Sequence, residues 1–499
     1  MNPSLRNFFG TRMAAAAVVV SFLFVLLRKL SGGGRWGIGM PLAEVDRFLN
    51  GEGFFYSTAQ TGYVPSSSYF PATALFFIPI RSMVPDNSAE TLLIFLAVLL
   101  SFACIGIFCY IASRSCPNRS FLVIMACFLV TTGFPSLRSY MAEWHPDIFV
   151  LLFGAIAALL MEAFVQSERH RMALGCGIVA ALAIACLFKQ NAVFLCIGFL
   201  AFVLRTHAIP RSDKAKLILF GVFAGLMALA IVMAIPGCFV STVTVNAGHA
   251  YLSLREWMRF LLVAIRDNIV FWLLLLVYCV LLRRRRLPEK SFLEGLWLYG
   301  AIGWFLFSMF GSIKDGANNG NIEAAMIALL PYALTAAYAM RDFTFAGRQM
   351  NPATWSNGTQ KLLAGAMVLF CLTLLGRSAK QVPAYFARCS DQQMMIEWLD
   401  EHHRGQDIAL CSTYYFYGKD ASIRPSTDFM TMEMFDMAGW PTEDEAQKLY
   451  ETYRWPVIVT VFKEKHPAKY PNIFKDYRQS HDSKIPKELE GMVWERIAP

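Results

Sequence analysis

The sequence predicts an all-α polytopic membrane protein that carries a small α/β domain at its carboxyl end. Hydrophobic residues make up 56% of the 499 residues and charged residues only 16%, whereas a soluble globular chain has about 45–50% and about 25%. The apolar residues gather in long blocks up to residue 379, and the chain beyond has a soluble composition. These observations exclude an ordinary soluble enzyme and a disordered or fibrous protein.

About eleven apolar segments approach the roughly 20 residues that a transmembrane helix needs. They start near Met13, Glu90, Ser120, Ile148, Ala173, Asn191, Leu217, Asn268, Phe292, Ile322 and Leu362. The first segment has no A-x-A cleavage site and is followed by RKLSGGGRW. We therefore interpret it as a membrane anchor and not as a signal peptide.

The loops between these segments predict the orientation of the chain. One alternating set carries about 18 Lys and Arg in roughly 67 residues, against about 11 in roughly 126 residues of the other set. The run Arg283 to Arg286 is the strongest contribution, whereas Arg28 and Lys29 favour the opposite orientation. Basic loops remain cytoplasmic, so we expect a multi-pass inner-membrane protein with a cytoplasmic amino terminus and a periplasmic or extracytoplasmic C-terminal domain. Basic residues distributed in this way argue against nucleic-acid binding.

The composition divides the chain into a transmembrane domain, residues 1–379, and a soluble α/β domain, residues 380–499. In the second, residues 392–401 and 443–453 read as helices, and DIALC, PVIVTV and MVWERI read as strands. Cys389 and Cys411 have the right compartment for one disulfide if this domain is extracytoplasmic, but the sequence leaves their state open.

The first outward loop contains a predicted amphipathic helix that begins at Pro41. Its apolar stripe consists of Leu42, Val45, Phe48 and Leu49. Asp46 lies at the edge of this stripe and Glu44 on the far edge. These acids are either a solvated helix face or carboxylates held at the lipid boundary. Residues 69–80 are too short to span a membrane and read as an interfacial or re-entrant helix.

Further ionisable residues lie at the outward ends of the predicted spans. Asp147 is in the first turn of a span, where it is either a functional group or a helix cap. It follows Arg138, Glu143 and His145, and the histidine alone is more typical of a structural residue than of a metal ligand. Lys189 interrupts a long apolar stretch, so it either snorkels at a hairpin tip or faces a cavity that accepts a lipid phosphate.

Residues 253–266 form a second predicted amphipathic helix. Arg255, Arg259 and Arg266 lie within about 40° of one another on its helical wheel, which suits either a donor phosphate or general lipid headgroups. Lys314, in a Gly- and Asn-rich segment, is part of a plain turn or reaches an anion. No nucleotide-binding or hydrolase motif occurs, so the energy for a reaction would come with the substrate.

Together these segments resemble the GT-C superfamily of membrane glycosyltransferases, in particular its bacterial protein-mannosyltransferase-like and aminoarabinose-transferase-like branch. The matching positions are Glu44-Val45-Asp46, Gly51 and Gly53 with Tyr56, Tyr69-Phe70-Pro71, Asp147, Lys189, and Gly316 to Asn319 with Asn321. The segment from Glu143 to Asp147 departs from the simpler acidic motif of the family, and the late loop has an extra residue before Asn321. These departures leave the sugar and the acceptor open.

The resemblance implies a GT-C fold and an inverting transfer of a sugar from a polyprenyl-phosphate donor to an acceptor hydroxyl or amine of a glycan, lipid or protein. In this role Asp46 is the base, with Glu44 and Asp147 as the other catalytic candidates. The residues expected to bind the donor phosphate are Lys189, Arg255, Arg259 and Lys314. Those expected to contact the substrates are Tyr56, Tyr69, Glu143, His145 and Asn321.

Some relatives use Mg²⁺ or Mn²⁺ and others need no metal; we expect no tightly bound metal and no other cofactor. The alternatives are a lipid-linked glycan polymerase, a ligase or a flippase. A secondary transporter is disfavoured because few charges lie at the midplane of the spans.

Overall fold

The computed structural model describes most of the helical part of the chain and parts of the C-terminal region. The described residues are 3–32, 45, 48–49, 72–84, 86–135, 138, 141–142, 145–235, 238–239, 242–243, 251–284, 287, 290–313, 319–340, 344–345, 348–349, 357–410, 424–428, 451, 454–459, 471–485, 491 and 493–497.

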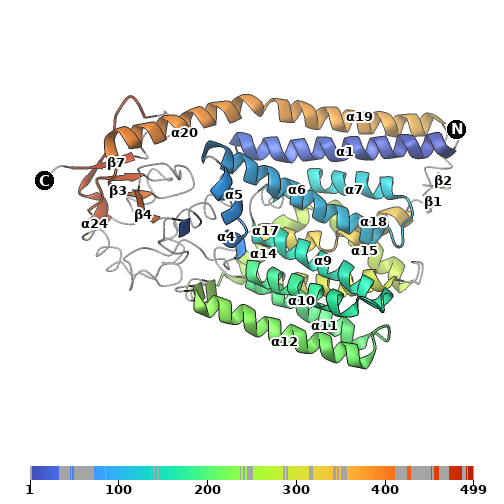
Figure 1. Cartoon of the computed structure of the whole chain (residues 1–499). Coiled ribbons are helices and arrows are strands. Elements are labelled where there is room, and N and C mark those ends of the chain that lie inside the picture. The colour runs from blue at the N-terminus through green and yellow to red at the C-terminus, as the bar shows by residue number, and fades with distance from the viewer. Residues whose placement is uncertain are drawn as a thin grey trace.

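A bundle of apolar helices forms the larger part of the molecule (Figure 1). Its helices are α1 (Pro3–Gly32), α6 (Asp86–Ala112), α7 (Arg119–Thr132), α9 (Pro146–Gln166), α10 (Arg171–Phe188), α11 (Val193–Arg205), α12 (Arg211–Ala234), α15 (Ile269–Arg283), α16 (Phe292–Gly311), α17 (Asn319–Ile327), α18 (Leu330–Met340) and α19 (Asn357–Ala379). Each predicted span falls on one of these helices or, for the tenth, on the pair α17 and α18. The chain is a multi-pass membrane protein.

Six described helices are long and apolar enough to cross a membrane alone, namely α1, α6, α9, α10, α12 and α16. A seventh crossing forms if α14 (Leu254–Asp267) and α15 count as one span, although the two are bent by 86°. The other predicted spans coincide with shorter helices or, for α19, with a helix whose described part does not pass the same test.

Close helix contacts hold the centre of the bundle. A Cβ atom at Gly198 of α11 would overlap the carbonyl of Tyr299 in α16, and one at Gly303 would overlap the carbonyl of Phe194. Small residues allow membrane helices to approach in this way, because van der Waals packing replaces the hydrophobic effect between spans. Trp297, fully buried in α16, donates a hydrogen bond of 2.8 Å from its indole to the carbonyl of Ala328.

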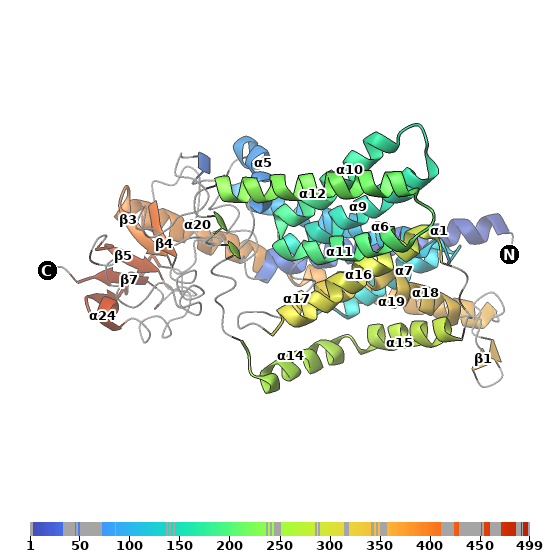
Figure 2. The ribbon, with the colours of Figure 1, turned by 90° about the horizontal axis from the view of Figure 1, so that it is seen from below.

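Helix α12 lies at the edge of the bundle, and α14 and α15 lie at the opposite edge in Figure 2. The large apolar side chains of α12 remain exposed, for example Leu219 and Phe223 at 65% each. Exposed apolar side chains over such a length are what a lipid-facing helix requires.

Short elements connect the long helices. The structure has α4 (Ala72–Leu75), α5 (Ile78–Met83), the 3-10 helix η1 (Gln190–Ala192), and the hairpin of β1 (Thr344–Phe345) and β2 (Arg348–Gln349). The predicted short helix after Tyr69 is thus divided between α4 and α5. Of the predicted helix in the first outward loop, only three residues are described: Val45 is buried, whereas Phe48 and Leu49 are 42% and 37% exposed.

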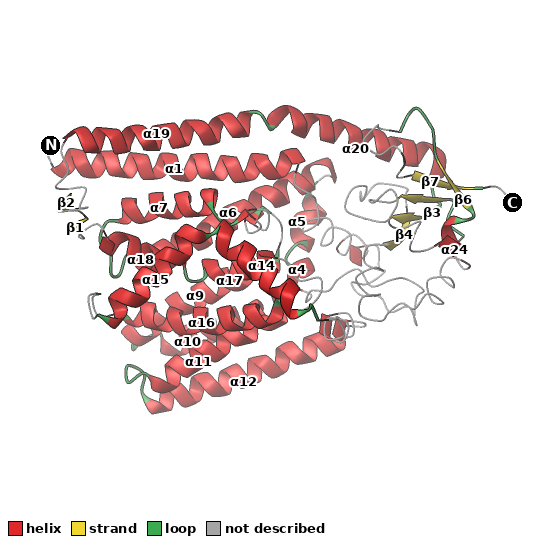
Figure 3. Ribbon diagram, turned by 180° about the vertical axis from the view of Figure 1, so that it is seen from behind, coloured by secondary structure: helices red, strands yellow, loops and turns green. Residues whose placement is uncertain are grey.

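Helix α20 (Val382–His403) follows α19 and leads away from the bundle to a sheet (Figure 3). The strands are β3 (Asp407–Leu410), β4 (Arg424–Asp428), β5 (Val457–Val459), β6 (Tyr477–Gln479) and β7 (Val493–Arg496), in the order β4-β3-β5-β7-β6, and the short helix α24 (Pro471–Phe474) precedes β6. β3 pairs in parallel with β4 and with β5, whereas β7 pairs antiparallel with β5 and with β6. The small α/β region expected from the sequence is therefore present.

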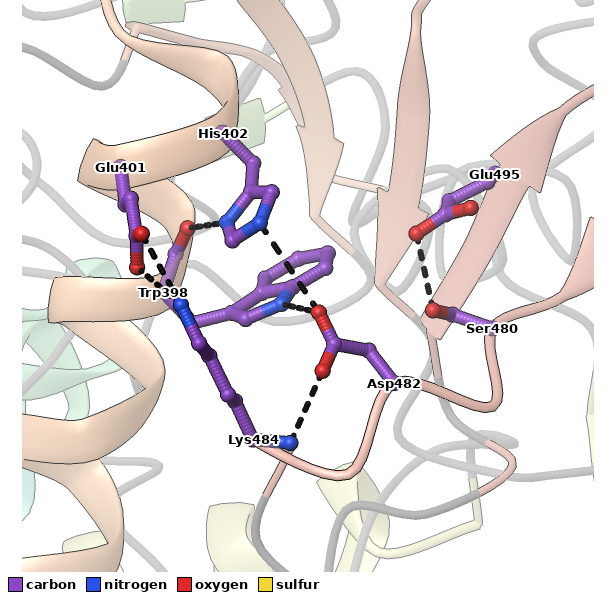
Figure 4. A network of polar contacts seen from close by, with 7 residues as sticks. All are labelled: Trp398, Glu401, His402, Ser480, Asp482, Lys484 and Glu495. Atoms are coloured by element: carbon purple, nitrogen blue, oxygen red, sulfur yellow. Dashed lines mark hydrogen bonds and ion pairs between the residues drawn. The ribbon is translucent and has the colours of Figure 1, made fainter.

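A polar network joins α20 to the loop after β6 (Figure 4). The indole of Trp398 donates to Asp482 Oδ2 at 2.8 Å, and Lys484 Nζ lies 2.9 Å from both carboxylate oxygens of Glu401. The Lys484 ammonium holds the pKa of Glu401 below its ordinary value. Because Trp398 is 2% exposed, the network fixes the end of α20 against the sheet region.

Candidate functional site

A buried cluster of three ionisable residues lies where α9 begins and α10 ends. Lys189 Nζ donates to both oxygens of Asp147, at 2.9 and 2.8 Å. His145 Nδ1 lies 3.1 Å from Asp147 Oδ2. The side chains are only 2% exposed for Asp147, 7% for His145 and 13% for Lys189.

The local sequence explains why these groups meet. Pro146 opens α9, and the His145 side chain accepts a hydrogen bond of 3.4 Å from the backbone N–H of Asp147. The cap is therefore His145, and the Asp147 carboxylate accepts from Lys189 instead. Lys189 is the C-cap of α10 in an extended conformation. An acid at a helix start and a base at a helix end both interact favourably with the helix dipoles.

Aromatic rings pack beneath the charged cluster. Phe188, next to Lys189, stacks on Phe149 of α9 with a centroid distance of 4.4 Å. Phe76, between α4 and α5, packs on the ring of Phe188 at a centroid distance of 5.2 Å. Ion pairs strengthen in such apolar surroundings because the local dielectric is low. The contact also places the segment after the first outward loop next to Lys189.

Two amide side chains beside Lys189 were not recognised as functional from the sequence. Gln190 Nε2 donates to the carbonyl of Thr242 at 3.1 Å. Gln190 Oε1 and Asn191 Oδ1 are buried and accept no hydrogen bond from any described residue. Buried acceptors are usually paired with protein groups or with ordered water, so these two amide oxygens are available to water or to a ligand that donates hydrogen bonds.

A second polar junction lies at the bend between α14 and α15. Asn268 is 3% exposed; its Oδ1 accepts from the backbone N–H of Phe134 at 2.6 Å, and its Nδ2 donates to Glu323 Oε1 at 3.3 Å. Phe134 has a positive φ of 50°. Glu323 is 1% exposed, and an acid at this position in a predicted span is a signal that the sequence analysis did not use.

The amphipathic helix predicted at 253–266 forms as α14. A capping box of Ser253 and Glu256 starts it, and Trp257 donates from its indole to Ser312 Oγ at 2.9 Å. Arg255 and Arg259 are both on its exposed side. The structure gives neither arginine a contact with the cluster around Lys189 among the described residues.

Several of the predicted site residues lie outside the described part of the chain. These are Glu44, Asp46, Tyr56, Tyr69, Glu143 and Lys314. Asn321 lies in α17, but only its backbone is described. Their roles stay predictions, as does the disulfide, because Cys411 and the side chain of Cys389 are also outside the described part.

The described residues contain no group of three or more His, Cys, Asp or Glu side chains arranged to hold a metal ion. The cluster at Lys189 offers one carboxylate and one imidazole, and the lysine ammonium occupies both carboxylate oxygens.

Residues 71–237 match the family model of dolichyl-phosphate-mannose-protein mannosyltransferase. This segment includes His145, Asp147 and Lys189. A search of curated proteins found no match. Among solved structures, the archaeal oligosaccharyltransferase AglB from Archaeoglobus fulgidus, in complex with an inhibitory peptide and a dolichol-phosphate, superposes with a TM-score of 0.52. The identity is 12%, over 95% of this chain and 73% of that one.

The chain has the GT-C fold. An apo form of an Archaeoglobus fulgidus oligosaccharyltransferase has a TM-score of 0.50 and 11% identity, covering 93% of this chain and 71% of that one. ArnT from Cupriavidus metallidurans, bound to undecaprenyl phosphate, has a TM-score of 0.47 and 15% identity, covering 96% and 84%. The predicted resemblance to the GT-C superfamily is confirmed.

Proposed function

We propose that this protein transfers a sugar from a polyprenyl-phosphate donor to an acceptor hydroxyl or amine of a glycan, lipid or protein. The observation that carries the proposal is the buried cluster of His145, Asp147 and Lys189, which lies within the segment matched by the mannosyltransferase family model. The description of that family names dolichyl-phosphate-mannose, a sugar on a lipid phosphate, and a cationic group at the end of a membrane helix suits such a phosphate.

In the proposed reaction, the acceptor oxygen or nitrogen attacks C1 of the sugar while the bond from C1 to the phosphate oxygen breaks. The acceptor proton goes to Asp46 as general base. The polyprenyl phosphate leaves with the electron pair of the broken bond, and the anomeric centre is inverted.

Lys189 would stabilise the charge that develops on the leaving phosphate. Asp147 is then a positioning residue, because its two oxygens fix the ammonium from one side. Because Asp147 already holds the Lys189 ammonium in place, the positive charge would not have to be reoriented during the reaction. Gln190 Oε1 and Asn191 Oδ1 would accept hydrogen bonds from sugar hydroxyls.

The remaining predicted residues complete the proposal. Arg255, Arg259 and Lys314 are further candidates for the donor phosphate, and Tyr56, Tyr69, Glu143, His145 and Asn321 for substrate contacts. Glu44 is the second acid of the first outward loop. We propose a periplasmic or extracytoplasmic site on an inner-membrane protein with a cytoplasmic amino terminus, and a reaction without a tightly bound metal.

A Lys189→Ala variant tests the phosphate role. We expect weaker donor binding together with slower turnover, since the interaction exists in the ground state and grows in the transition state. The control is Lys216→Ala, whose side chain is 62% exposed near the start of α12 and should leave both quantities unchanged. Normal donor binding and turnover in Lys189→Ala would contradict the role of Lys189.

A further inference from the structure

Two thiols meet just inside the turn that carries Lys189. Cys186 lies in the last turn of α10 and Cys196 in the first turn of α11, and their Sγ atoms are 3.8 Å apart. Both cysteines are free, and both are partly buried. The reaction proposed above uses neither of them.

The helices that carry the two thiols pack on different neighbours. α10 packs mainly on α9, and α11 mainly on α16. A Cβ atom at Gly177 of α10 would lie 3.3 Å from Leu160 of α9, whereas one at Gly198 of α11 would overlap the backbone of α16. The contact between the thiols therefore joins two halves of the bundle at the turn that connects them.

A disulfide is within reach of this pair. The S–S bond of a disulfide is about 2.05 Å long, so the two sulfurs have to approach each other by less than about 2 Å. Rotation of a cysteine side chain between its staggered χ1 positions moves the sulfur over a distance of this order. Both residues also lie next to a turn, where the backbone yields more easily than in the middle of a helix.

The pair lies near the surface of the bundle, at one end of the spans. Val193 and Leu200 share the face of α11 that carries Cys196, because they are three and four residues away, and they are 43% and 41% exposed. Phe76 packs on Phe188, which is two residues from Cys186, and the helices on either side of Phe76, α4 and α5, lie at the end of the bundle nearest the C-terminal sheet (Figure 1). The thiols thus belong to the same side as that sheet.

We propose that Cys186 and Cys196 form a disulfide that locks the turn bearing Lys189. The oxidant is a protein disulfide on the extracytoplasmic side, where disulfides persist. One cysteine thiolate attacks the disulfide of the oxidant, which gives a mixed disulfide and releases one thiolate of the oxidant. The other cysteine then attacks the cysteine sulfur of the mixed disulfide and releases the second thiolate. Two electrons and the two thiol protons pass to the oxidant, which leaves as a dithiol.

The ring closed by this bond contains the polar end of the candidate site. Lys189, Gln190 and Asn191 all lie between the two cysteines, so the bond restrains their backbone and opposes opening of the turn away from Asp147. The inference rests on the extracytoplasmic side proposed above for Lys189, but not on the chemistry of sugar transfer.

Mass spectrometry of the full-length protein from native membranes tests the bond. The membranes are acidified and alkylated with N-ethylmaleimide before solubilisation, so that air cannot oxidise free thiols afterwards. Trypsin cleaves after Lys189, so the disulfide would join peptides 172–189 and 190–205. We expect this linked pair in the majority of molecules, its loss on reduction, and its absence from Cys186→Ser. The matched control is Cys176→Ser, which removes an exposed thiol of the same peptide, about 15 Å along the helix from Cys186, and should keep the link.

Hydrogen exchange and thermal unfolding test the lock. Reduction of wild type should speed exchange of the amides of residues 187–195 and lower the thermal midpoint, whereas Cys196→Ser should show the reduced values with or without reductant. Serine is no larger than cysteine, so the variant should fold, which an unchanged elution volume would show.

Two results would overturn the proposal. One is the recovery of both thiols alkylated from native membranes, even if diamide formed the bond in purified protein. The other is a linked pair whose reduction changes neither the exchange nor the midpoint. Neither readout involves sugar transfer, so failure of the disulfide leaves the proposed reaction standing, and failure of the transfer assay leaves the disulfide standing.

Discussion

The ion pair between Asp147 and Lys189 gives the sharpest quantitative prediction. Asp147→Asn keeps the shape of the side chain but removes the charge that faces the ammonium at 2.8 and 2.9 Å. The side chains are 2% and 13% exposed, so water compensates little for the loss. Leaving one partner of a buried pair uncompensated costs about 3–5 kcal/mol.

The pair Arg171–Asp213 supplies a matched control. It joins the first turns of α10 and α12 at 3.1 Å, with side chains 32% and 13% exposed, and Asp213 also lies 3.7 Å from Lys216 Nζ, whose side chain is 62% exposed. An ion pair that is partly open to solvent contributes about 0–1 kcal/mol. Asp213→Asn should therefore lower stability far less than Asp147→Asn.

A double-mutant cycle with Lys189→Met separates the ion pair from the effects of each side chain. Both single variants should unfold at clearly lower temperature or denaturant concentration than wild type in the same detergent. The double variant should cost less than the sum of the single ones, with a coupling of about 3 kcal/mol. Additive effects, or an Asp147→Asn cost no larger than that of Asp213→Asn, would refute the argument.

Three further predictions concern the base, the helix packing and the C-terminal region. Asp46→Asn should slow turnover by about 10²–10⁴-fold with donor binding preserved, and Glu44→Gln should remain near normal; the reverse pattern would move the base by two residues. Gly198→Ala should destabilise the bundle by about 1–3 kcal/mol or more, measured by thermal unfolding, whereas Gly225→Ala, which meets no atom within 4 Å, should not. Burial lowers the pKa of His403 from its ordinary 6.5, so the unfolded state binds this proton more readily and the C-terminal region should lose stability as the pH falls below about 6.5. His403→Gln should reduce that loss in a pH series of thermal midpoints, and an unchanged slope would contradict it.

The positions of the spans followed from the sequence because long apolar runs have few other stable conformations in a membrane. The bend of 86° at Asn268 did not. Hydropathy records only the length and polarity of a segment. At the bend, Asn268 accepts a hydrogen bond from the Phe134 N–H and donates one to Glu323, and both partners lie far away in the chain. In the C-terminal region, the strands at 407–410, 457–459 and 493–496 were predicted from their apolar runs. The strand at 424–428 is polar, RPSTD, and pairs in parallel with β3, so its own sequence carries little signal.

The candidate site was predicted only as separate residues. Asp147 and Lys189 were both recognised, since an ionisable residue at a span end is conspicuous. Their direct contact was not, because it depends on how α9 and α10 pack. The alternative of capping for Asp147 had the right position but the wrong side chain, as His145 provides the cap. Gln190 and Asn191 were overlooked because amides at a hairpin tip are common in any loop.

The most direct test of the proposed reaction is the release of polyprenyl phosphate. The purified full-length protein would be incubated with a defined polyprenyl-phosphate sugar and a membrane extract as the source of acceptors. We expect release of polyprenyl phosphate together with loss of sugar from the donor, and a rate that falls strongly in Lys189→Ala but not in Lys216→Ala. No release with any of a panel of polyprenyl-phosphate sugars, from protein that is folded and retains donor, would contradict the assignment of this chain as a glycosyltransferase.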